Sequence, residues 1–567
     1  MSQPWFERWP DLKAFEEERF KACHLPWRED SGLLERGYLA VDTEVQFKGA
    51  PLEIKVIYPS EYPELPPHVY SESAVLTRHQ QPFSGNFCLL EHPIDSWTPG
   101  SWGAADLIDV QLRKLLEHSE AGEGTVRENE APMPEPVTAH FRYEQDAVVV
   151  VPGELATPAG DSGEFEIAAF DGNRYLLRRV GDAEINEHLT EPFPCQQKLL
   201  GRWKRLDQLP LPDIGPTGQE VRVWLESEHP DLFPAKPPPP PPRKRQKRLK
   251  RRDEQHVIGL VLPEEREATG ETRDSWMFLA VRGKQANLLH AQELSEEERL
   301  RRIPDLAGLG TKKAVVIGLG SLGGDVALHL ARANVGTIAL ADFDRMEINN
   351  SVRHALGVEW AGINKASALA GACRRANPCC TVEPVLLHLG EINAHPTPLS
   401  ILEEQIVDAD VVIETTGVNQ IEHLVGRVAW DFGKSVITCW LTDGSWAGEV
   451  VRLAPGETMC VTCFQRGQRE GSLLVGNADP AEVPIAVQGC SHPTVSGAGF
   501  DAAETAAMAA RLAIQSILDG DGYPAPEWDH AVANFRRSPE DGEFPRFASE
   551  TLLPNEDCVA CSSPGAG

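Results

Sequence analysis

The stretch from residue 315 to 344 could bind the phosphates of a nucleotide. An apolar run leads into Gly318, Gly320 and Gly323 at the spacing Gly-x-Gly-x-x-Gly, and a second apolar run ends at Asp342. Glycines let the backbone approach a phosphate, and the N-terminus of the following helix favours its negative charge. A carboxylate roughly 20 residues further on can hold ribose hydroxyls. The motif alone leaves a dinucleotide-dependent dehydrogenase and other nucleotide enzymes equally open.

Three side chains that suit phosphate follow this motif, namely Asn350, Arg353 and Lys365. A dehydrogenase does not need them, whereas an enzyme that attacks the α-phosphate of ATP must stabilise charge on phosphate oxygens. From about residue 298 to the C-terminus, the sequence resembles the ThiF/MoeB/ubiquitin-activating family. The resemblance implies a doubly wound α/β adenylation domain that uses ATP and Mg²⁺. In it, Asp342 would hold the ribose and the other three side chains the phosphates.

The same resemblance gives roles to two further positions. Arg302 matches the arginine that reaches into the partner subunit's ATP site, which implies a homodimer. Gly417 stands where relatives usually place an aspartate for magnesium. Glu414 and Asp410, which flank the apolar run Val411–Ile413, are the alternative ligands that the sequence offers.

Two Cys-x-x-Cys pairs, Cys460 with Cys463 and Cys558 with Cys561, lie in the C-terminal part of the chain. Two such pairs are typical of a closed tetrahedral zinc site with four thiolate ligands. A redox-active dithiol is the alternative, and the presence of a second pair argues against it. Relatives in the ThiF/ubiquitin-activating family place such pairs at the same positions, so we expect structural zinc.

Cys490 lies outside both pairs and is a candidate nucleophile. An Ala-rich predicted helix, Ala502–Leu518, follows it, and a helix N-terminus lowers the pKa of a nearby thiol. Members of the resembled family carry their acyl-accepting cysteine on the loop before the corresponding helix. The resemblance therefore implies that Cys490 forms a thioester. A buried structural cysteine is the alternative interpretation.

A second candidate thiol, Cys88, lies in the first 125 residues. The expected elements here are a helix, two strands of alternating polarity and a closing helix: Leu12–Ala22, Leu39–Phe47, Leu52–Tyr58 and Ala105–His118. With Tyr-Pro…Pro-Pro before Cys88 and Trp97-Thr98-Pro99 after it, this order resembles the α+β ubiquitin-conjugating fold. The resemblance implies that Cys88 accepts an acyl group by thioester exchange. Without that context, a buried small apolar residue is the simpler interpretation.

The residues around Cys88 depart from the resembled family in one respect. Its members usually carry His-Pro-Asn upstream of the cysteine, whereas this chain has His79-Gln80-Gln81-Pro82. The amide of Gln80 or Gln81 is the candidate replacement for the asparagine that stabilises the oxyanion. His92 is either a nearby base or a surface histidine.

Residues 126–292 form a predicted β-rich middle region without recognisable chemistry. The expected strands are Ala147–Val151, Phe165–Phe170, Tyr175–Val180, Val221–Leu225, His256–Pro263 and Trp276–Val281. A proline run and a strongly basic run at 236–252 interrupt them and cannot build a core. We expect a disordered insertion there. A tether, a basic docking patch and a polyproline ligand are its functional alternatives.

The overall composition limits the classes of function. The chain has 567 residues and 41% hydrophobic residues, which fits three or four domains with hydrophobic cores. From the motifs and the resemblances, we expect a multidomain α/β protein with boundaries at 1–125, 126–292 and 293–567. Its net charge of −31 argues against nucleic acid as a general partner. No apolar run approaches the roughly 18 residues of a membrane span, and the N-terminus does not resemble a signal peptide. We therefore expect a cytoplasmic protein with no membrane association.

Together, the two halves predict an ATP-dependent transferase. The C-terminal glycine carboxylate of a ubiquitin-like protein would be adenylated, captured by Cys490, passed to Cys88 and joined to a lysine of a target protein. The order of the domains resembles bacterial ubiquitin-transferase-like fusions of CBASS antiviral operons, in which the activated protein is a nucleotidyltransferase. Sulfur-carrier adenylation is the alternative, although it has no use for Cys88. A non-catalytic scaffold is a third possibility, supported only by Gly417.

Overall fold

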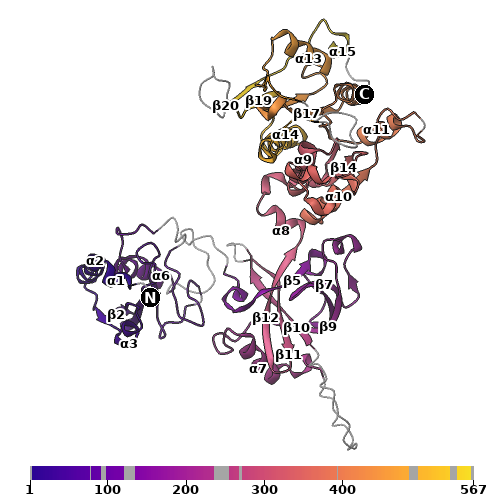
Figure 1. Cartoon of the computed structure of the whole chain (residues 1–567). Helices are drawn as coiled ribbons and strands as arrows, with labels where there is room; N and C mark the ends of the chain where they lie inside the picture. Colours follow the sequence, from indigo (N-terminus) through magenta and orange to yellow (C-terminus); the bar gives the residue numbers. More distant parts are fainter. Residues whose placement is uncertain are drawn as a thin grey trace, which may run out of the picture. The chain divides into compact units, whose positions relative to one another are not determined.

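The computed structural model describes residues 3–76, 78–90, 97–119, 135–234, 255–266, 271–392, 394–483, 485, 496–536 and 546–562. The chain divides into two compact units. The first unit comprises residues 1–185 and 195–293, and the second comprises 186–194 and 294–567 (Figure 1). Cys490, His92 and the predicted insertion at 236–252 lie outside the described residues.

The N-terminal part of the first unit is an antiparallel sheet with helices. The sheet order is β1-β2-β3-β4, from Arg28–Glu29, Ala40–Phe47, Ala50–Ile57 and His68–Tyr70. The helices are α1 (Trp5–Arg8), α2 (Pro10–Ala22), α3 (Ser31–Glu35), α5 (Ala104–Asp106) and α6 (Arg113–Ser119), the last two joined by a wider helical turn at Leu107–Leu112. The predicted helices and alternating strands are confirmed here. Their inward-facing residues, such as Phe20, Val41 and Ile54, form one core.

The rest of the first unit is a closed mixed sheet. Its order is β5-β12-β11-β10-β9-β6-β7-β8, and β5 also pairs with β7, so the sheet returns on itself (Figure 1). The strands are β5 (Tyr143–Pro152), β6 (Ser162–Asp171), β7 (Arg174–Val180), β8 (Ala183–Glu184), β9 (Gln197–Arg205), β10 (Gln255–Glu265), β11 (Thr272–Arg282) and β12 (Gln285–Leu294). Aromatic rings fill part of its interior, where Trp276 stacks on Phe278 at 5.1 Å between ring centroids.

One predicted strand of this region is wrong. Val221–Leu225 lies within helix α7, Gly218–Glu228. The helix begins after Thr217, whose hydroxyl accepts a hydrogen bond from Glu220 N, while Glu220 Oε2 accepts one from Thr217 N. This capping box is a local start signal for a helix. Val221 and Leu225 are buried and Val223 is exposed, so the apolar residues follow a spacing of four rather than two.

The second unit contains a sheet of order β15-β14-β13-β16-β17-β18-β19-β20. Its strands are β13 (Lys313–Ile317), β14 (Thr337–Ala341), β15 (Thr381–Val385), β16 (Val411–Glu414), β17 (Ser435–Leu441), β18 (Ala447–Leu453), β19 (His530–Asn534) and β20 (Arg546–Glu550). The pairings from β15 to β17 are parallel, and those from β17 to β20 are antiparallel. A parallel sheet needs helical crossovers, which the chain supplies.

Helices cover both faces of the parallel strands, as the predicted doubly wound fold requires. On one face, α9 (Ser321–Arg332), α10 (Lys365–Ala376) and α14 (Gly499–Leu518) pack against Val316 and Leu340. On the other, α11 (Pro398–Val407) and α12 (Asn419–Asp431) pack against neighbours such as Val315 and Ala339. Successive strand residues face opposite sides, and both sides are apolar because both are covered.

Shorter helices complete the unit: α8 (Glu296–Leu300), α13 (Val461–Glu470) and α15 (Val559–Ser562). Among the residues that the structure describes, no helix combines the length and the apolar character that crossing a bilayer requires.

Candidate functional site

A cleft of about 1830 Å³ opens where the parallel strands of the second unit end. The turns that follow β13, β14 and β16 line it. Ligands of doubly wound folds bind at this edge of the sheet. The cleft brings together most of the predicted ATP-binding residues: Gly318, Gly320, Asp342, Asn350, Arg353 and Lys365.

The three glycines of the turn have different surroundings. Gly318 has φ +83°, a backbone conformation that other residues rarely adopt. A Cβ on Gly323 would lie 2.0 Å from Gly318 O and 2.5 Å from Thr415 Oγ1. Gly323 therefore lets helix α9 approach the strands closely and is not a lining residue of the cleft. A Cβ on Gly320 would meet nothing within 4 Å, so this glycine faces the open cleft.

Backbone amides hold the Asp342 carboxylate at the end of β14. Leu319 N donates to Oδ2 and Asp344 N donates to Oδ1, each at 2.7 Å. The first bond ties the carboxylate to the glycine turn, and the second fixes the turn that follows the strand. Hydrogen bonds to a charged acceptor are stronger than those to a neutral one. The two bonds thus fix the orientation of the carboxylate among the residues that line the cleft.

The predicted phosphate ligands lie beside it. Lys365, at the start of α10, forms an ion pair with Asp344 at 3.1 Å. Asn350 Oδ1 accepts a hydrogen bond from Glu347 N at 3.0 Å, which orients its amide NH₂ for donation. Burial lowers the pKa of Arg353, and an arginine remains charged in proteins. A buried cation and two oriented donors suit a ligand with several negative oxygens.

The alternative magnesium ligands do not occupy equivalent places. Asp410 precedes β16, binds Lys313 N at 2.8 Å and is not among the lining residues. The strand separates it from the cleft, so the interpretation of Asp410 as a ligand is wrong. Glu414 lines the cleft, but it is 2% exposed and accepts hydrogen bonds from Thr416 and Thr438. Its oxygens are therefore engaged by the protein.

The sequence analysis missed an aromatic contact at the cleft. Phe343 stacks on His388, with 4.2 Å between ring centroids and an interplanar angle of 22°, and both residues line the cleft. Phe343 directly follows Asp342, so its place at the strand end could have indicated a contact with the nucleotide. No motif marks His388, which follows β15 in another part of the sequence.

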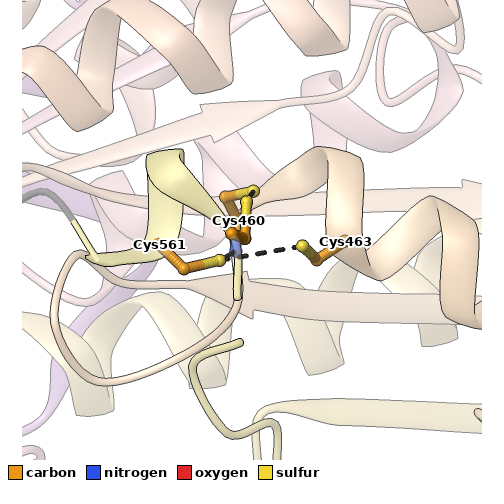
Figure 2. Close-up of side chains that lie close together, drawn as sticks. Cys460, Cys463 and Cys561 are labelled. Atoms are coloured by element: carbon orange, nitrogen blue, oxygen red, sulfur yellow. Dashed lines mark hydrogen bonds between the residues drawn. The ribbon is translucent and has the colours of Figure 1, made fainter. Parts of the chain in front are cut away.

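The four cysteines of the two pairs converge, as Figure 2 shows for Cys460, Cys463 and Cys561. The ligand atoms of all four lie within 4.8 Å of one another. Cys460 Sγ is 3.9 Å from Cys558 Sγ, and Cys561 Sγ is 3.8 Å from Cys463 Sγ. A tetrahedron with Zn–S bonds of about 2.3 Å has edges of about 3.8 Å. The cluster can bind a metal ion of this kind.

Arg302 follows α8 and is not among the residues that line the cleft of its own chain. Its predicted role in a partner's site stays a prediction. Cys490, for which the sequence predicts a thioester, lies outside the described residues, and its role also stays a prediction.

Cys88 is an exposed residue of the first unit and directly follows a short antiparallel bridge. Gln80 pairs with Phe87 in this bridge, and Cys88 N donates to His79 O at 2.8 Å. Burial and, to a smaller extent, the charge of Glu135 raise the pKa of the Cys88 thiol. The thiol is thus a protonated, accessible nucleophile until a base acts on it.

The two candidate amides near Cys88 brace the loop instead of facing a substrate. Gln80 is 8% exposed, and its amide donates to Ala74 O at 2.9 Å and accepts from Leu76 N at 2.8 Å. Gln81 accepts from Phe83 N at 2.8 Å and donates to His140 O at 3.4 Å. These bonds account for the conformation of the loop. The expectation that Gln80 or Gln81 supplies an oxyanion donor gains no support from this geometry.

Two protein-family models match the parts of the chain that hold the cleft and Cys88. The model of the ThiF family matches residues 295–548, and that of the prokaryotic E2 family B matches residues 18–150. The chain is a fusion of an E2-like region with a ThiF-type region. The E2 match extends past residue 125 and into β5, so it includes the segment around Glu135.

Individual relatives span different parts of this E2–ThiF fusion. The uncharacterized protein y4oA of Sinorhizobium fredii is 26% identical over 99% of this chain and 98% of its own length. The ATP-dependent ubiquitin transferase-like protein Cap2 of Pseudomonas aeruginosa is 25% identical over 34% of this chain and 33% of its own length. Among solved structures, E. coli MccB is similar at 16% identity and a TM-score of 0.35, covering 46% of this chain and 74% of MccB.

Proposed function

We propose that this E2–ThiF fusion activates the C-terminal glycine carboxylate of a ubiquitin-like or ubiquitin-tail-like protein with ATP and conjugates it to an amine. One observation carries the proposal. The glycine turn, Asp342, Arg353 and Lys365 share a cleft in a ThiF-family region, while an exposed thiol, Cys88, lies in an E2-family region of the same chain.

In the adenylation step, the carboxylate attacks the α-phosphate and pyrophosphate leaves. Asp342, held by two backbone amides, would bind the ribose hydroxyls. Arg353, Lys365 and Asn350 would stabilise the negative charge that develops on the phosphate oxygens. Mg²⁺, when bound with ATP, neutralises part of the triphosphate charge. Asp344, which lines the cleft beside Lys365, is a partly exposed carboxylate that would approach the ion.

The activated acyl group then passes to sulfur. Cys490 would attack the adenylate and release AMP, and Cys88 would take the acyl group by thioester exchange. Placing both thiols in one chain raises the effective concentration of the second exchange. A homodimer, with Arg302 donated to the partner's site, and a role in antiphage defence belong to the same proposal.

Zinc is the metal proposed for the four-cysteine cluster. Sulfur–sulfur distances of 3.8 and 3.9 Å match the edges of a ZnS₄ tetrahedron. Cys558 and Cys561 lie near the C-terminal end of the described residues, whereas Cys460 directly precedes α13 and Cys463 lies in its first turn. The ion would thus fasten this distant segment to the ThiF-type region.

ATP–pyrophosphate exchange tests the proposal. The purified chain is mixed with ATP, Mg²⁺, labelled pyrophosphate and a candidate carrier that ends in glycine, such as a protein encoded beside the gene. We expect carrier-dependent exchange that falls at least roughly a hundredfold in Arg353→Ala. The matched control is Arg427→Ala, an exposed arginine of α12 paired with Asp431. Absence of exchange with every carrier would favour a scaffold, and a thiocarboxylate product would identify sulfur-carrier chemistry.

A further inference from the structure

Residues from later in the chain contact the segment 78–88, which carries Cys88 and is called the strip below. Arg78 Nη1 donates to both Glu265 oxygens at 3.0 and 3.2 Å, and Phe83 packs edge-on against Phe141 at 5.2 Å between ring centroids. Glu135 N also binds Glu265 Oε2 at 3.2 Å. The segment that begins at Glu135 and the end of β10 therefore contact the same strip from later parts of the chain. These contacts bring an additional carboxylate close to the thiol.

That carboxylate belongs to Glu135, and it makes a two-point contact with His79. His79 N donates to its oxygens at 2.9 and 3.0 Å, and His79 Nδ1 lies 3.0 Å from Oε1. His79 has φ +59°, a left-handed conformation that side chains other than glycine adopt only when surrounding contacts support it. The contact with Glu135 supplies this support. It also fixes the orientation of the imidazole ring, because one carboxylate holds both the backbone and the ring.

His79 and Cys88 are neighbours across the strip. His79 precedes Gln80 and Cys88 follows Phe87. Because Gln80 and Phe87 form an antiparallel bridge, this places His79 and Cys88 opposite each other, and Cys88 N donates to His79 O at 2.8 Å. The negative charge of Glu135 is close enough to oppose ionisation of the Cys88 thiol. The imidazole of His79 and the carboxylate of Glu135 are thus in direct contact, and Cys88 is the cross-strand neighbour of His79. Hydrogen bonds to His79 lower the pKa of Glu135 although burial raises it, so this acid is ionised at neutral pH.

We propose that His79 and Glu135 form the proton-accepting pair for transfer of an acyl group from Cys88 to an amine. This inference rests on the proposed function, in which Cys88 carries a thioester. His79 is the acid–base group, and Glu135 is a positioning residue that orients the ring and stabilises its charged form. The same arrangement selects the acceptor, because a negative charge beside the thioester attracts an ammonium group and repels a carboxylate.

The step balances as follows. The ammonium group of the acceptor gives one proton to the His79–Glu135 pair and becomes a neutral amine. Its nitrogen attacks the thioester carbonyl carbon, so a C–N bond forms and the C–S bond breaks. The remaining excess proton of the nitrogen moves to the departing sulfur and regenerates the Cys88 thiol. The pair then returns its proton to water, and no oxidant, reductant or further cofactor is required.

Discharge of a preformed thioester tests this inference in the full chain. Cys88 is loaded with ATP and the carrier, ATP is removed, and loss of the thioester is followed after addition of free lysine at several pH values. In Glu135→Gln and His79→Asn, we expect loading of Cys88 within about twofold of wild type. Discharge by lysine should be roughly a hundredfold slower, and its rate should no longer rise with pH as it does in wild type. Asparagine suits position 79 because it adopts left-handed φ more readily than most residues. Glu135→Asp should recover part of the rate, and Glu144→Gln, an exposed acid of β5, is the matched control.

A second nucleophile separates catalysis from folding. Hydroxylamine is already unprotonated at neutral pH, so its discharge of the thioester should change by less than about twofold in both variants, whereas a misfolded strip would slow both nucleophiles equally. Equal slowing with lysine and hydroxylamine, or lysine discharge at the wild-type rate, would overturn the role of the pair. If wild-type Cys88 forms no thioester at all, the proposed function itself fails, which is a different and recognisable result.

Discussion

Glu414 offers a quantitative test of the electrostatics in the cleft of the second unit. Burial, the charge of Glu422 and the hydrogen bonds of Thr416 and Thr438 act on its carboxyl group, and their sum raises its pKa from 4.5 to about 7. Between these two values the folded protein binds a proton that the unfolded chain has released. This contribution to stability is therefore fully present below pH 4.5 and is lost as the pH rises towards 7. A difference of 2.5 pH units corresponds to about 3 kcal/mol.

Glu414→Gln removes this dependence while keeping the shape of the side chain. The amide oxygen can still accept from Thr416 N, and its NH₂ group can donate to the Thr438 hydroxyl, which accepts as well as donates. At pH 8 we expect the free energy of unfolding of the second unit to rise by about 3 kcal/mol relative to wild type. At pH 5 the change should be less than about 1 kcal/mol, because wild-type Glu414 is then mostly protonated in the folded state.

Hydrogen exchange in denaturant, read on peptides from β16, measures the unfolding of the second unit alone. Rates are corrected for intrinsic exchange at each pH. Glu404→Gln, an exposed acid of α11, is the control and should have no effect at either pH. The electrostatic reasoning would be refuted if Glu414→Gln destabilised the unit equally at both pH values. That result would mean that the carboxylate is required in its charged form, as a magnesium ligand would be.

Three further predictions concern the cleft and the cysteine cluster. Asp342→Asn should weaken ATP binding about tenfold or more, because a neutral amide replaces the carboxylate that faces the ribose and two backbone amides. Calorimetry measures the Kd, and an unchanged Kd would exclude ribose binding by Asp342. Gly323→Ala should destabilise the second unit by more than about 2 kcal/mol and reduce ATP binding in parallel, since its Cβ would lie 2.0 Å from Gly318 O. Gly433→Ala, where an added Cβ meets nothing but φ is +67°, is its control for strain alone. Cys558→Ser should lower the zinc content measured by mass spectrometry and loosen residues 546–562 in hydrogen exchange, whereas Cys195→Ser should change neither.

The sequence indicated the ThiF-type region well because its signals are local. The glycine turn, the acid at the end of β14 and the cysteine pairs each depend on short spacings, and the cleft and cluster contain them as expected. The prediction of Asp410 as a magnesium ligand was wrong because Asp410 and Glu414, although close in sequence, lie at opposite ends of β16. The strand is only four residues long, yet Glu414 at its end lines the cleft and Asp410 before its start does not.

The region around Cys88 was harder to predict because its contacts come from distant segments. Glu135 and Glu265 carry no motif, yet they bind His79 and Arg78. Gln80 and Gln81 were predicted to replace the missing asparagine, whereas their side chains form hydrogen bonds with backbone groups of the surrounding loop. Helix α7 was missed for another reason: a run of Val and Trp favours a strand, and the capping box at Thr217 together with burial at Val221 and Leu225 decided for a helix.

The central claim, a relay between two thiols, is tested most directly on a non-reducing gel. The purified chain is incubated with ATP, Mg²⁺ and the candidate carrier, and wild type is compared with Cys88→Ala, Cys490→Ala and Cys195→Ser as the control. The account predicts a thiol-labile adduct on Cys88 in wild type, an adduct on Cys490 in Cys88→Ala, and none in Cys490→Ala. Adenylation without an adduct on either cysteine, or an adduct that survives in Cys490→Ala, would contradict it.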